Sequence, residues 1–334
     1  MIINAGYARK RCPEMKSRLI FLVLMLATFA SFTAAADDWP NRPIHFIVPL
    51  PAGGSTDVAA RIVGDYLSRT FGQQIVVENK PGANTNIGME YVAKSAPDGY
   101  TVLIGTDAVS SNRHIYTMNF DPLKDLAPVV ELSRQAVALA AHPSLGVTTL
   151  AGLTALAKQQ SGMRFATGSG FGSLHAMVAL WYAKLAGISL VQVPYRGGAE
   201  MITDLVAGHV QLGSIGTTPL IPYYKIGALN LLAQSMATRS HSLPNVPTFQ
   251  EGGMNGLVID QRNGVFVAVG TPPEIIARLS TEINAALGDE QVRKSFIDQA
   301  QEPVGGGVEQ YAKIVNEDSE KYARLLKELN VTVP

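Results

Sequence analysis

The sequence predicts an α/β protein made of two domains with a cleft between them. Short apolar runs typical of β-strands alternate with amphipathic runs at helical spacing, an order that produces parallel strands joined by right-handed crossovers. One long apolar segment at 128–143, with few turn signals, interrupts the alternation before it resumes. We interpret this segment as a strand that leaves one domain and enters the other. A cleft between two such domains is a common place for a small-molecule site.

The first domain is expected to begin with three strands and two helices. The strand IHFIVPL leads to a helix that starts at Asp57 and is stopped by Gly72, a typical helix end. The turn Pro97-Asp98-Gly99 precedes the third strand. The expected elements are a strand at 44–50, a helix at 57–72, a strand at 74–79, a helix at 85–96 and a strand at 100–105.

The second domain is expected to repeat this alternation. Its elements are a helix at 150–160, a strand at 163–167, a helix at 174–187, a strand at 189–195, a helix at 199–208, a strand at 209–216, a short helix at 219–227 and a strand at 228–235. A further strand at 265–270 and charged amphipathic helices are expected to pack back on the first domain. We therefore expect residues 37–138 plus 262–334 to form one domain and residues 139–261 the other.

The N-terminus has the pattern of an export signal. Basic residues precede an apolar run, Leu19–Ala30, which is about a dozen residues long and shorter than the roughly 20 that span a bilayer. Small residues ending at Ala36 follow, so we expect a signal peptide at 1–36 that is cleaved after Ala36. Met15 offers an alternative start, and a retained membrane anchor is the alternative to cleavage. The only cysteine, Cys12, lies in this segment, so the exported chain would hold no disulfide, thiol nucleophile or lipid-bearing cysteine.

Composition and motifs argue against several classes of function. The formal net charge is zero and no basic run lies beyond the first 18 residues, so no nucleic-acid partner is expected. The loop at 168–173 departs from the dinucleotide fingerprint because Ser173 stands where its last glycine belongs. The six histidines lack the spacing of metal ligands, and no nucleophile–base pair is visible. We therefore expect no cofactor, no metal and no catalytic residue.

Two glycine-rich loops follow one plan, once in each expected domain. In each, a strand delivers a Gly/Ser/Thr loop to a helix start: PAGGST at 51–56 and GSGFGS at 168–173. Free backbone N–H groups and the helix dipole make such a place attractive to an anion, and glycine lets a ligand come close. Two loops of this kind could clamp a carboxylate-bearing molecule. The alternative is that both are ordinary turns with Ser/Thr caps.

Three further residues are candidates near these loops. Tyr195 and Arg196 end a strand just before a helix, where a hydroxyl and a guanidinium could contact a carboxylate. His175 lies in the first turn of the helix after the second loop. The alternatives are a surface ion pair for Arg196 and local packing for His175.

Several stretches together resemble one protein family. The chain resembles the periplasmic solute-binding receptors of tripartite tricarboxylate transporters, the TctC or Bug-type proteins. The stretches that carry the resemblance, in the order and spacing of the family, are RPIHFIVPLPAGGSTDVAARIV, QQIVVENKPGANTNIG, AKSAPDGYTVLIGT, FATGSGFGSLH, VPYRGGAEMITDLVAGHV, LPNVPTFQEGG and GTPPEIIARL.

The resemblance implies a two-domain Venus-flytrap fold, of the type II periplasmic-binding-protein kind, that captures a small carboxylate in its cleft. The ligand would be held through backbone amides and ordered water more than through charged side chains. Carried over position by position, the expected ligand-binding residues are Ala52, Gly53, Gly54, Ser55, Thr56, Asn84, Thr106, Ser169, Gly170, Phe171, Gly172, Ser173, His175, Tyr195, Arg196, Gly197, Thr217 and Arg262.

The chain departs from the family pattern at a few positions. Ala52 replaces a proline, Asn84 and Thr85 replace two glycines, and Arg262 stands where the family commonly has a tryptophan. If Arg262 faces the cleft, an aromatic lid has become a cation and the ligand is more anionic or more polar than an aromatic acid. The alternative is an Arg262 exposed at the hinge.

The resulting expectation is a non-enzymatic receptor in the periplasm that delivers a carboxylate to a membrane permease. Its expected partners are the small carboxylate and the permease subunits, and the protein is expected to be a monomer. A ligand sensor for a signalling system and a periplasmic enzyme acting on a carboxylate are the alternatives. Dicarboxylates, tricarboxylates, amino acids and aromatic acids all remain open as ligands.

Overall fold

The computed structural model describes residues 1–2 and 39–331, so residues 3–36 of the expected signal peptide and its cleavage point lie outside the described residues. The described residues from 42 to 331 belong to one compact unit, and the description below concerns them. Within the described residues, no helix combines the length and the apolar character needed to cross a membrane.

A mixed ten-stranded sheet forms the centre of this unit. Its order is β2-β1-β3-β9-β4-β7-β5-β6, and β8 and β10 pair with β4. The strands are β1 (Ile44–Val48), β2 (Ile75–Asn79), β3 (Thr101–Thr106), β4 (Leu126–Ala141), β5 (Met163–Thr167), β6 (Leu190–Pro194), β7 (Leu212–Gly216), β8 (Asn230–Gln234), β9 (Asp260–Ala268) and β10 (Glu302–Pro303). As predicted, β1, β2 and β3 are parallel. β9 instead runs antiparallel to both β3 and β4, which makes the sheet mixed.

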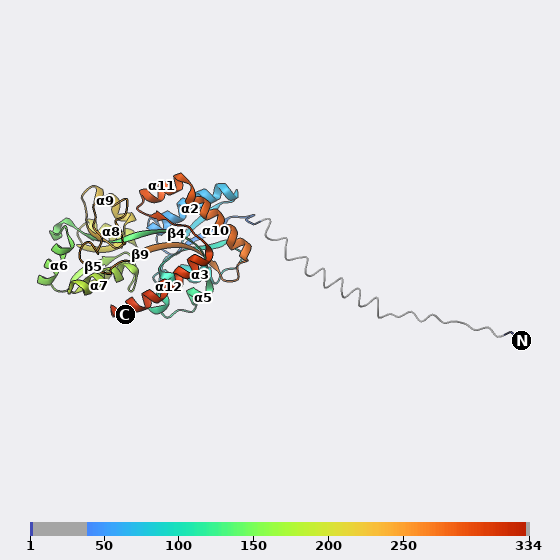
Figure 1. Ribbon diagram of the computed structural model, residues 1–334, viewed down its shortest axis with the longest axis horizontal. Coiled ribbons are helices and arrows are strands. Elements are labelled where there is room, and N and C mark those ends of the chain that lie inside the picture. The colour runs from blue at the N-terminus through green and yellow to red at the C-terminus, as the bar shows by residue number, and fades with distance from the viewer. Residues whose placement is uncertain (3–38, 332–334) are drawn as a thin grey trace. The chain divides into compact units, whose positions relative to one another are not determined.

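Helices surround the strands at both ends of the sheet (Figure 1). They are α2 (Ser55–Phe71), α3 (Asn86–Ala93), α4 (Ala108–Ser111), α5 (Pro122–Asp125), α6 (Leu150–Gln159), α7 (Leu174–Ala186), α8 (Gly198–Val206), α9 (Ile221–Lys225), α10 (Pro273–Gly288), α11 (Glu290–Asp298) and α12 (Val308–Glu328). Short 3₁₀ helices occur at η1 (Asn112–His114), η2 (Pro143–Leu145) and η3 (Thr218–Leu220).

β4 belongs to two halves of the sheet. Its residues 126–136 pair with β9, whereas residues 137–141 pair with β7 and residues 138–141 pair with β8. We call β1, β2, β3, β9 and the first part of β4, with their helices, the first lobe. The second part of β4 with β5 to β8 forms the second lobe. Figure 1 shows β4 and β9 running between these two groups. The domain boundaries expected at 138/139 and 261/262 stay a prediction.

Alternation along β4 builds two cores in the second lobe. Val137 and Leu139 pack among residues of α6 and α7, while Ala138 and Ala140 pack on the opposite face among residues of α8 and α9. Successive strand residues point to opposite faces, so one strand with small and branched apolar residues serves both cores. Helices therefore cover both faces of this part of the sheet.

The C-terminal helix α12 packs against both lobes. Tyr311 and Val315, in its first half, lie in the apolar core of the first lobe. Tyr322 and Leu325, two to three turns later, lie in a core of the second lobe. The sequence predicts packing on the first domain alone. The difference arises because the 21 residues of α12 extend about 30 Å, enough to reach past one lobe.

Candidate ligand-binding site

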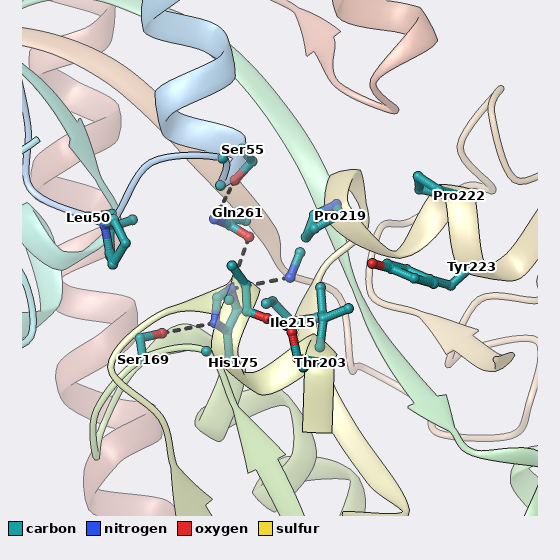
Figure 2. Close-up of a pocket in the computed structure, with 18 residues that line it drawn as sticks. Leu50, Ser55, Ser169, His175, Thr203, Ile215, Pro219, Pro222, Tyr223 and Gln261 are labelled. Carbon is teal, nitrogen blue, oxygen red and sulfur yellow. Dashed lines mark hydrogen bonds between the residues drawn. The ribbon is translucent and has the colours of Figure 1, made fainter. Parts of the chain in front are cut away.

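A cavity of about 360 Å³ lies between the two lobes, where the glycine-rich loops meet. We call it the cleft cavity (Figure 2). Its lining comprises Leu50, Pro51, Gly53, Gly54, Ser55, Gly168, Ser169, His175, Gly198, Ala199, Ile202, Thr203, Ile215, Gly216, Pro219, Pro222, Tyr223 and Gln261. Its volume is at the lower end of the range for small-molecule sites, roughly 300–1,000 Å³.

The first loop presents an uncapped helix N-terminus to the cleft cavity. Gly54 is the N-cap of α2, has an extended backbone and carries no side chain that could cap the helix. Nothing but Pro51 O, at 3.8 Å, would meet a Cβ added at Gly54, so open space lies in front of these N–H groups. The first N–H groups of an α-helix have no intrahelical acceptor. A ligand anion is therefore a suitable partner for them.

Asp57 holds the first loop in place. Its carboxylate accepts hydrogen bonds from Gly53 N, from Arg61 and from Asn79 Nδ2, each at 3.0 Å. Burial by itself raises the pKa of Asp57, but the hydrogen bonds from Arg61, Gly53 and Asn79 outweigh it and hold the pKa below its ordinary value. Asp57 therefore acts as a charged brace for the loop, as its place in the first helical turn indicates.

The second loop is held by neutral groups. Thr167 Oγ1 donates to Ser169 O at 2.7 Å, and Ser169 Oγ lies 2.9 Å from His175 Nδ1. Ser173 is the N-cap of α7 and accepts a hydrogen bond from Ala176 N through its own side chain. The helix after the second loop thus supplies its own cap, in contrast to α2.

The N-terminus of α8 takes the place opposite α2 in the cleft cavity. Gly198 and Ala199, its first two residues, line the cavity, and no side chain caps the helix at Gly197. A Cβ added at Gly168 would lie 2.8 Å from Gly198 Cα. Glycine at position 168 therefore lets the second loop lie directly against the start of α8. Two uncapped N-termini, those of α2 and α8, face one cavity from different lobes.

His175 and Gln261 connect the two lobes at the wall of the cleft cavity. His175 Nε2 lies 3.1 Å from Gln261 Oε1, and Gln261 Nε2 lies 3.5 Å from Ser55 Oγ (Figure 2). Burial lowers the pKa of His175 to about 4, and the hydrogen bond to Gln261 offsets only part of this effect. The imidazole is therefore neutral near pH 7 and contributes hydrogen bonds without a charge.

Two further cavities, one larger and one much smaller, adjoin the cleft cavity. A side cavity of about 600 Å³ is lined by Asn84, Gly170, Tyr195 and Arg196 among others. An inner cavity of about 30 Å³ is lined by Thr106, Ser173 and Asp107 among others. Burial raises the pKa of Asp107 to about 7 despite the opposing effect of backbone hydrogen bonds. Leu50 and Ser169 line all three spaces, so these form one continuous region of the cleft.

Comparison with known proteins identifies the family. Residues 59–331 match the model of the tripartite tricarboxylate transporter family receptor. The chain is also 31% identical to Protein BugT of Bordetella pertussis over 318 residues, which cover 93% of this chain and 97% of the relative. The chain belongs to the tripartite tricarboxylate transporter receptor family.

Solved structures agree with the family assignment. The structure of R. palustris Rpa4515 with adipate has 33% identity to this chain and a TM-score of 0.85, and covers 88% of this chain and 99% of that one. The periplasmic binding protein BugD has 26% identity and a TM-score of 0.83, with the same coverage. The predicted family and α/β periplasmic-binding-protein fold are confirmed. A family of transporter receptors also sets aside the alternative of an enzyme.

The predicted ligand-binding residues of the receptor divide by position. Those that line the cleft cavity are Gly53, Gly54, Ser55, Ser169 and His175. Those that line the side cavity or the inner cavity without lining the cleft cavity are Asn84, Thr106, Gly170, Ser173, Tyr195 and Arg196. Those that line none of the three are Ala52, Thr56, Phe171, Gly172, Gly197, Thr217 and Arg262.

Several residues of the last group make structural contacts. Thr56 Oγ1 donates to Asn263 Oδ1 at 2.8 Å in the protein interior, and Thr217 N donates to Ala136 O at 3.0 Å. Phe171 O accepts from Tyr116 Oη at 2.6 Å, which joins the two lobes. Ala52 is exposed beside the first loop.

Gly172 and Gly197 give room to residues of the first lobe. A Cβ at Gly172 would lie 2.5 Å from Ile115 Cδ1, and one at Gly197 would lie 2.7 Å from Pro51 Cγ. These glycines act by allowing the lobes to approach, which explains their place beside the cleft without contact with its cavities.

Arg262 lies in an ion-pair cluster outside the three cavities. Its guanidinium is 2.7 Å from Glu131 Oε1 and 3.0 Å from Asp318 Oδ2, and its side chain is 19% exposed. The structure therefore places Arg262 neither at the cleft cavity nor in open solvent at the hinge. Side chains alternate along β9, and Gln261, the preceding residue, takes the cleft-facing position.

Sequence reasoning missed Gln261, the helix start at Gly198 and the apolar side of the cleft cavity. A signal for Gly198 was present, since the pair Gly197-Gly198 precedes a helix much as Gly53-Gly54 does. Gln261 offered no such signal, because residues 260–263 are all polar and their alternating burial is visible only in the folded strand β9. The strand was also expected to start only at 265, whereas β9 starts at Asp260.

Proposed function

We propose that this receptor binds a small organic carboxylate in the cleft cavity and delivers it to a membrane permease. The observation that carries the proposal is the facing pair of uncapped helix N-termini, α2 and α8, at one cavity in a chain of this receptor family. Helix N-termini favour anions through their free N–H groups and the positive end of the helix dipole. The bound adipate of a related structure supports a carboxylate as the anion.

Binding would use the neutral groups of the wall. Within the described part of the chain, no Lys, Arg, Asp or Glu lines the cleft cavity. Backbone N–H groups of Ser55 and Ala199 would donate to the carboxylate, and the Ser169 hydroxyl would add a further donor. His175, neutral near pH 7, would hold Ser169 in position.

Closure of the lobes would enclose the ligand. Contacts between the lobes already surround the cleft cavity: Tyr116 donates to Phe171 O, and Gln261 reaches both Ser55 and His175. A ligand that binds groups of both lobes favours the closed arrangement, because only there are all its contacts made. The closed form would then present a surface to the permease.

The proposal extends to location and assembly. The receptor would be exported with cleavage after Ala36 and act as a monomer in the periplasm. Its two domains would be residues 37–138 plus 262–334 and residues 139–261. N-terminal sequencing and light scattering of the exported protein test these points, and an uncleaved chain or a stable dimer would contradict them.

A substitution at Gly54 tests the binding site. Gly54→Leu should fold normally, because the backbone of Gly54 is extended and open space lies around it. The added side chain should fill the cavity and weaken carboxylate binding by about a hundredfold or more, about 2.7 kcal/mol. A thermal-shift screen of organic acids on the unaltered protein first finds a ligand, which calorimetry then measures on the variant.

Gly307→Leu is the matched control. Gly307 is also an extended N-cap glycine without a side-chain cap and with nothing near its added Cβ, but it begins α12. The control should bind as the unaltered protein does. Undiminished affinity in Gly54→Leu would contradict the proposed site, and the lack of any carboxylate ligand would contradict the proposed function.

A further inference from the structure

The cleft cavity has two ends of different chemistry. In Figure 2, Ser55, Ser169, His175 and Gln261 gather at one end, with the hydrogen bonds that join them. Ile215, Pro219, Pro222 and Tyr223 lie toward the other end. A ligand in this cavity meets polar groups on one side and hydrocarbon on the other.

The local sequence makes the second end apolar. Pro219 and Pro222 lie in the first turns of η3 and α9, and proline has no N–H to offer a ligand. Ile202 and Ile215 belong to the apolar core behind them. Apart from the Tyr223 hydroxyl, η3 and α9 therefore approach the cavity with carbon atoms, whereas α2 and α8 approach it with N–H groups.

The one hydroxyl at the α8 side of this end is already bonded. Thr203 Oγ1 donates to Ala199 O at 3.0 Å within its own helix. A charged ligand group placed here would find only the neutral hydroxyl of Tyr223 as a side-chain donor, which is a poor replacement for its hydration. A hydrocarbon group would instead gain from burial.

The charges around the cavity match a single anion. Among the lining residues, all of which the structure describes, none is a Lys, Arg, Asp or Glu. At the polar end, the uncapped N-terminus of α2 and the Ser169 hydroxyl are available to a first carboxylate, whereas a second one at the opposite end would find only the neutral hydroxyl of Tyr223. Arg262, which could have supplied a cation, is held by Glu131 and Asp318 away from the cavity.

We propose that the ligand is a monocarboxylate with an uncharged apolar body, an alkyl or aryl acid. Its carboxylate binds at Ser55, Ser169 and Ala199, and its body packs on Ile202, Ile215 and Tyr223. This inference rests on the proposed function and names the substrate class of the same site. It differs from the dicarboxylate in the related adipate structure.

Matched pairs of acids test the inference. Hexanoate and adipate differ only in a methyl or carboxylate at the far end, and benzoate and terephthalate form an aromatic pair. Calorimetry on the full exported protein should give each monocarboxylate an affinity at least about tenfold higher than that of its matched dicarboxylate. Equal or tighter binding of the dicarboxylates would overturn the inference while leaving the receptor function intact. Tight binding of hydroxylated di- or tricarboxylates alone would overturn it in the same way, whereas no binding of any carboxylate would contradict the function itself.

A charge placed at the apolar end should reverse the preference. Tyr223→Arg puts a guanidinium at this end on a partly exposed position of α9, where folding should tolerate it. The adipate-to-hexanoate affinity ratio should rise by at least about tenfold. Tyr224→Arg, the next residue of the same helix and not part of the lining, should leave the ratio unchanged. The same ratio in both variants would show that this end does not hold the ligand's body and would overturn the inference.

Discussion

The two glycine-rich loops follow one plan in the sequence, yet the protein holds them in different ways. The first loop is braced by a charged group, Asp57, and leaves the N-terminus of α2 open. The second loop is held by neutral groups around His175, and Ser173 closes the N-terminus of α7. The open N-terminus of the second lobe is that of α8. A repeated sequence pattern therefore places a loop without fixing which of its N–H groups stay available.

Substitution of a glycine by alanine should have the largest and most different effects on the stability of the two loops. Gly168→Ala should lower the free energy of unfolding by about 3 kcal/mol, because its Cβ would lie 2.8 Å from Gly198 Cα and 2.7 Å from Ile215 Cδ1. Gly54→Ala has no such neighbour and should change it by less than about 0.5 kcal/mol. Urea unfolding measures both, and equal effects would show that the second loop does not lie against α8.

The brace of the first loop should depend on charge. Asp57→Asn should cost about 2 kcal/mol at pH 7, a value discounted for the half-exposed Arg61. The folded-state pKa of Asp57 is lowered, so the brace is fully present above the unfolded value and is lost as the pH falls through the folded value. The cost should therefore shrink below about pH 4. Asp65→Asn, at an exposed acid on the same helix, serves as the control. If the loss of stability in Asp57→Asn were the same at all pH values, the charge of Asp57 would not hold the loop.

As the pH falls, the stability that depends on the second loop should be lost at a higher pH than the stability that depends on Asp57. The folded-state pKa of His175 is about 4, below the ordinary 6.5. The unfolded chain therefore binds a proton first, and the free energy of unfolding decreases as the pH falls from about 6.5 to 4. His175→Gln should reduce the stability difference between pH 7 and pH 4.5 by about 1.5 kcal/mol. Denaturant melts at the two pH values measure this, with His241→Gln at an exposed site for comparison. An unchanged difference would mean that His175 is not enclosed.

The cap of α7 should have the smallest effect. Ser173→Ala removes an N-cap whose Oγ lies 3.4 Å from Ala176 N, a long contact, and should cost about 0.5–1 kcal/mol. Carboxylate affinity should stay within about twofold, because the N-terminus it caps is not the one that faces the cleft cavity. A large loss of affinity in calorimetry would restore α7 as the second anion-binding helix.

Local pattern sufficed for most elements and for the loop positions. The strand at 163–167 and the helix ends at Gly72 and Gly187 follow from apolar alternation and glycine stops, which depend on neighbouring residues alone. The contacts of Arg262 did not follow, because a shift of one position along a strand exchanges its two faces. The partners Glu131 and Asp318 are more than 50 residues away in the chain, so only the folded sheet and α12 bring them together.

The site was predictable in its loops and less so in its walls. Gly53, Gly54, Ser55, Ser169 and His175 line the cleft cavity as expected positions of the loops. The apolar end, with Pro219 and Tyr223, depends on how η3 and α9 pack after β7, a tertiary arrangement that periodicity does not encode.

The packing of α12 gives the receptor a third tether between its lobes. Tyr311 packs in one lobe and Tyr322 in the other, so a swing of the lobes must bend this helix or unseat one of its ends. In the proposed closure, part of the free energy that separates the open and closed forms would therefore depend on a helix whose residues line none of the three cavities of the cleft. Substitutions at Tyr311 or Tyr322 would then change the receptor's apparent affinity through residues that line no cavity of the cleft.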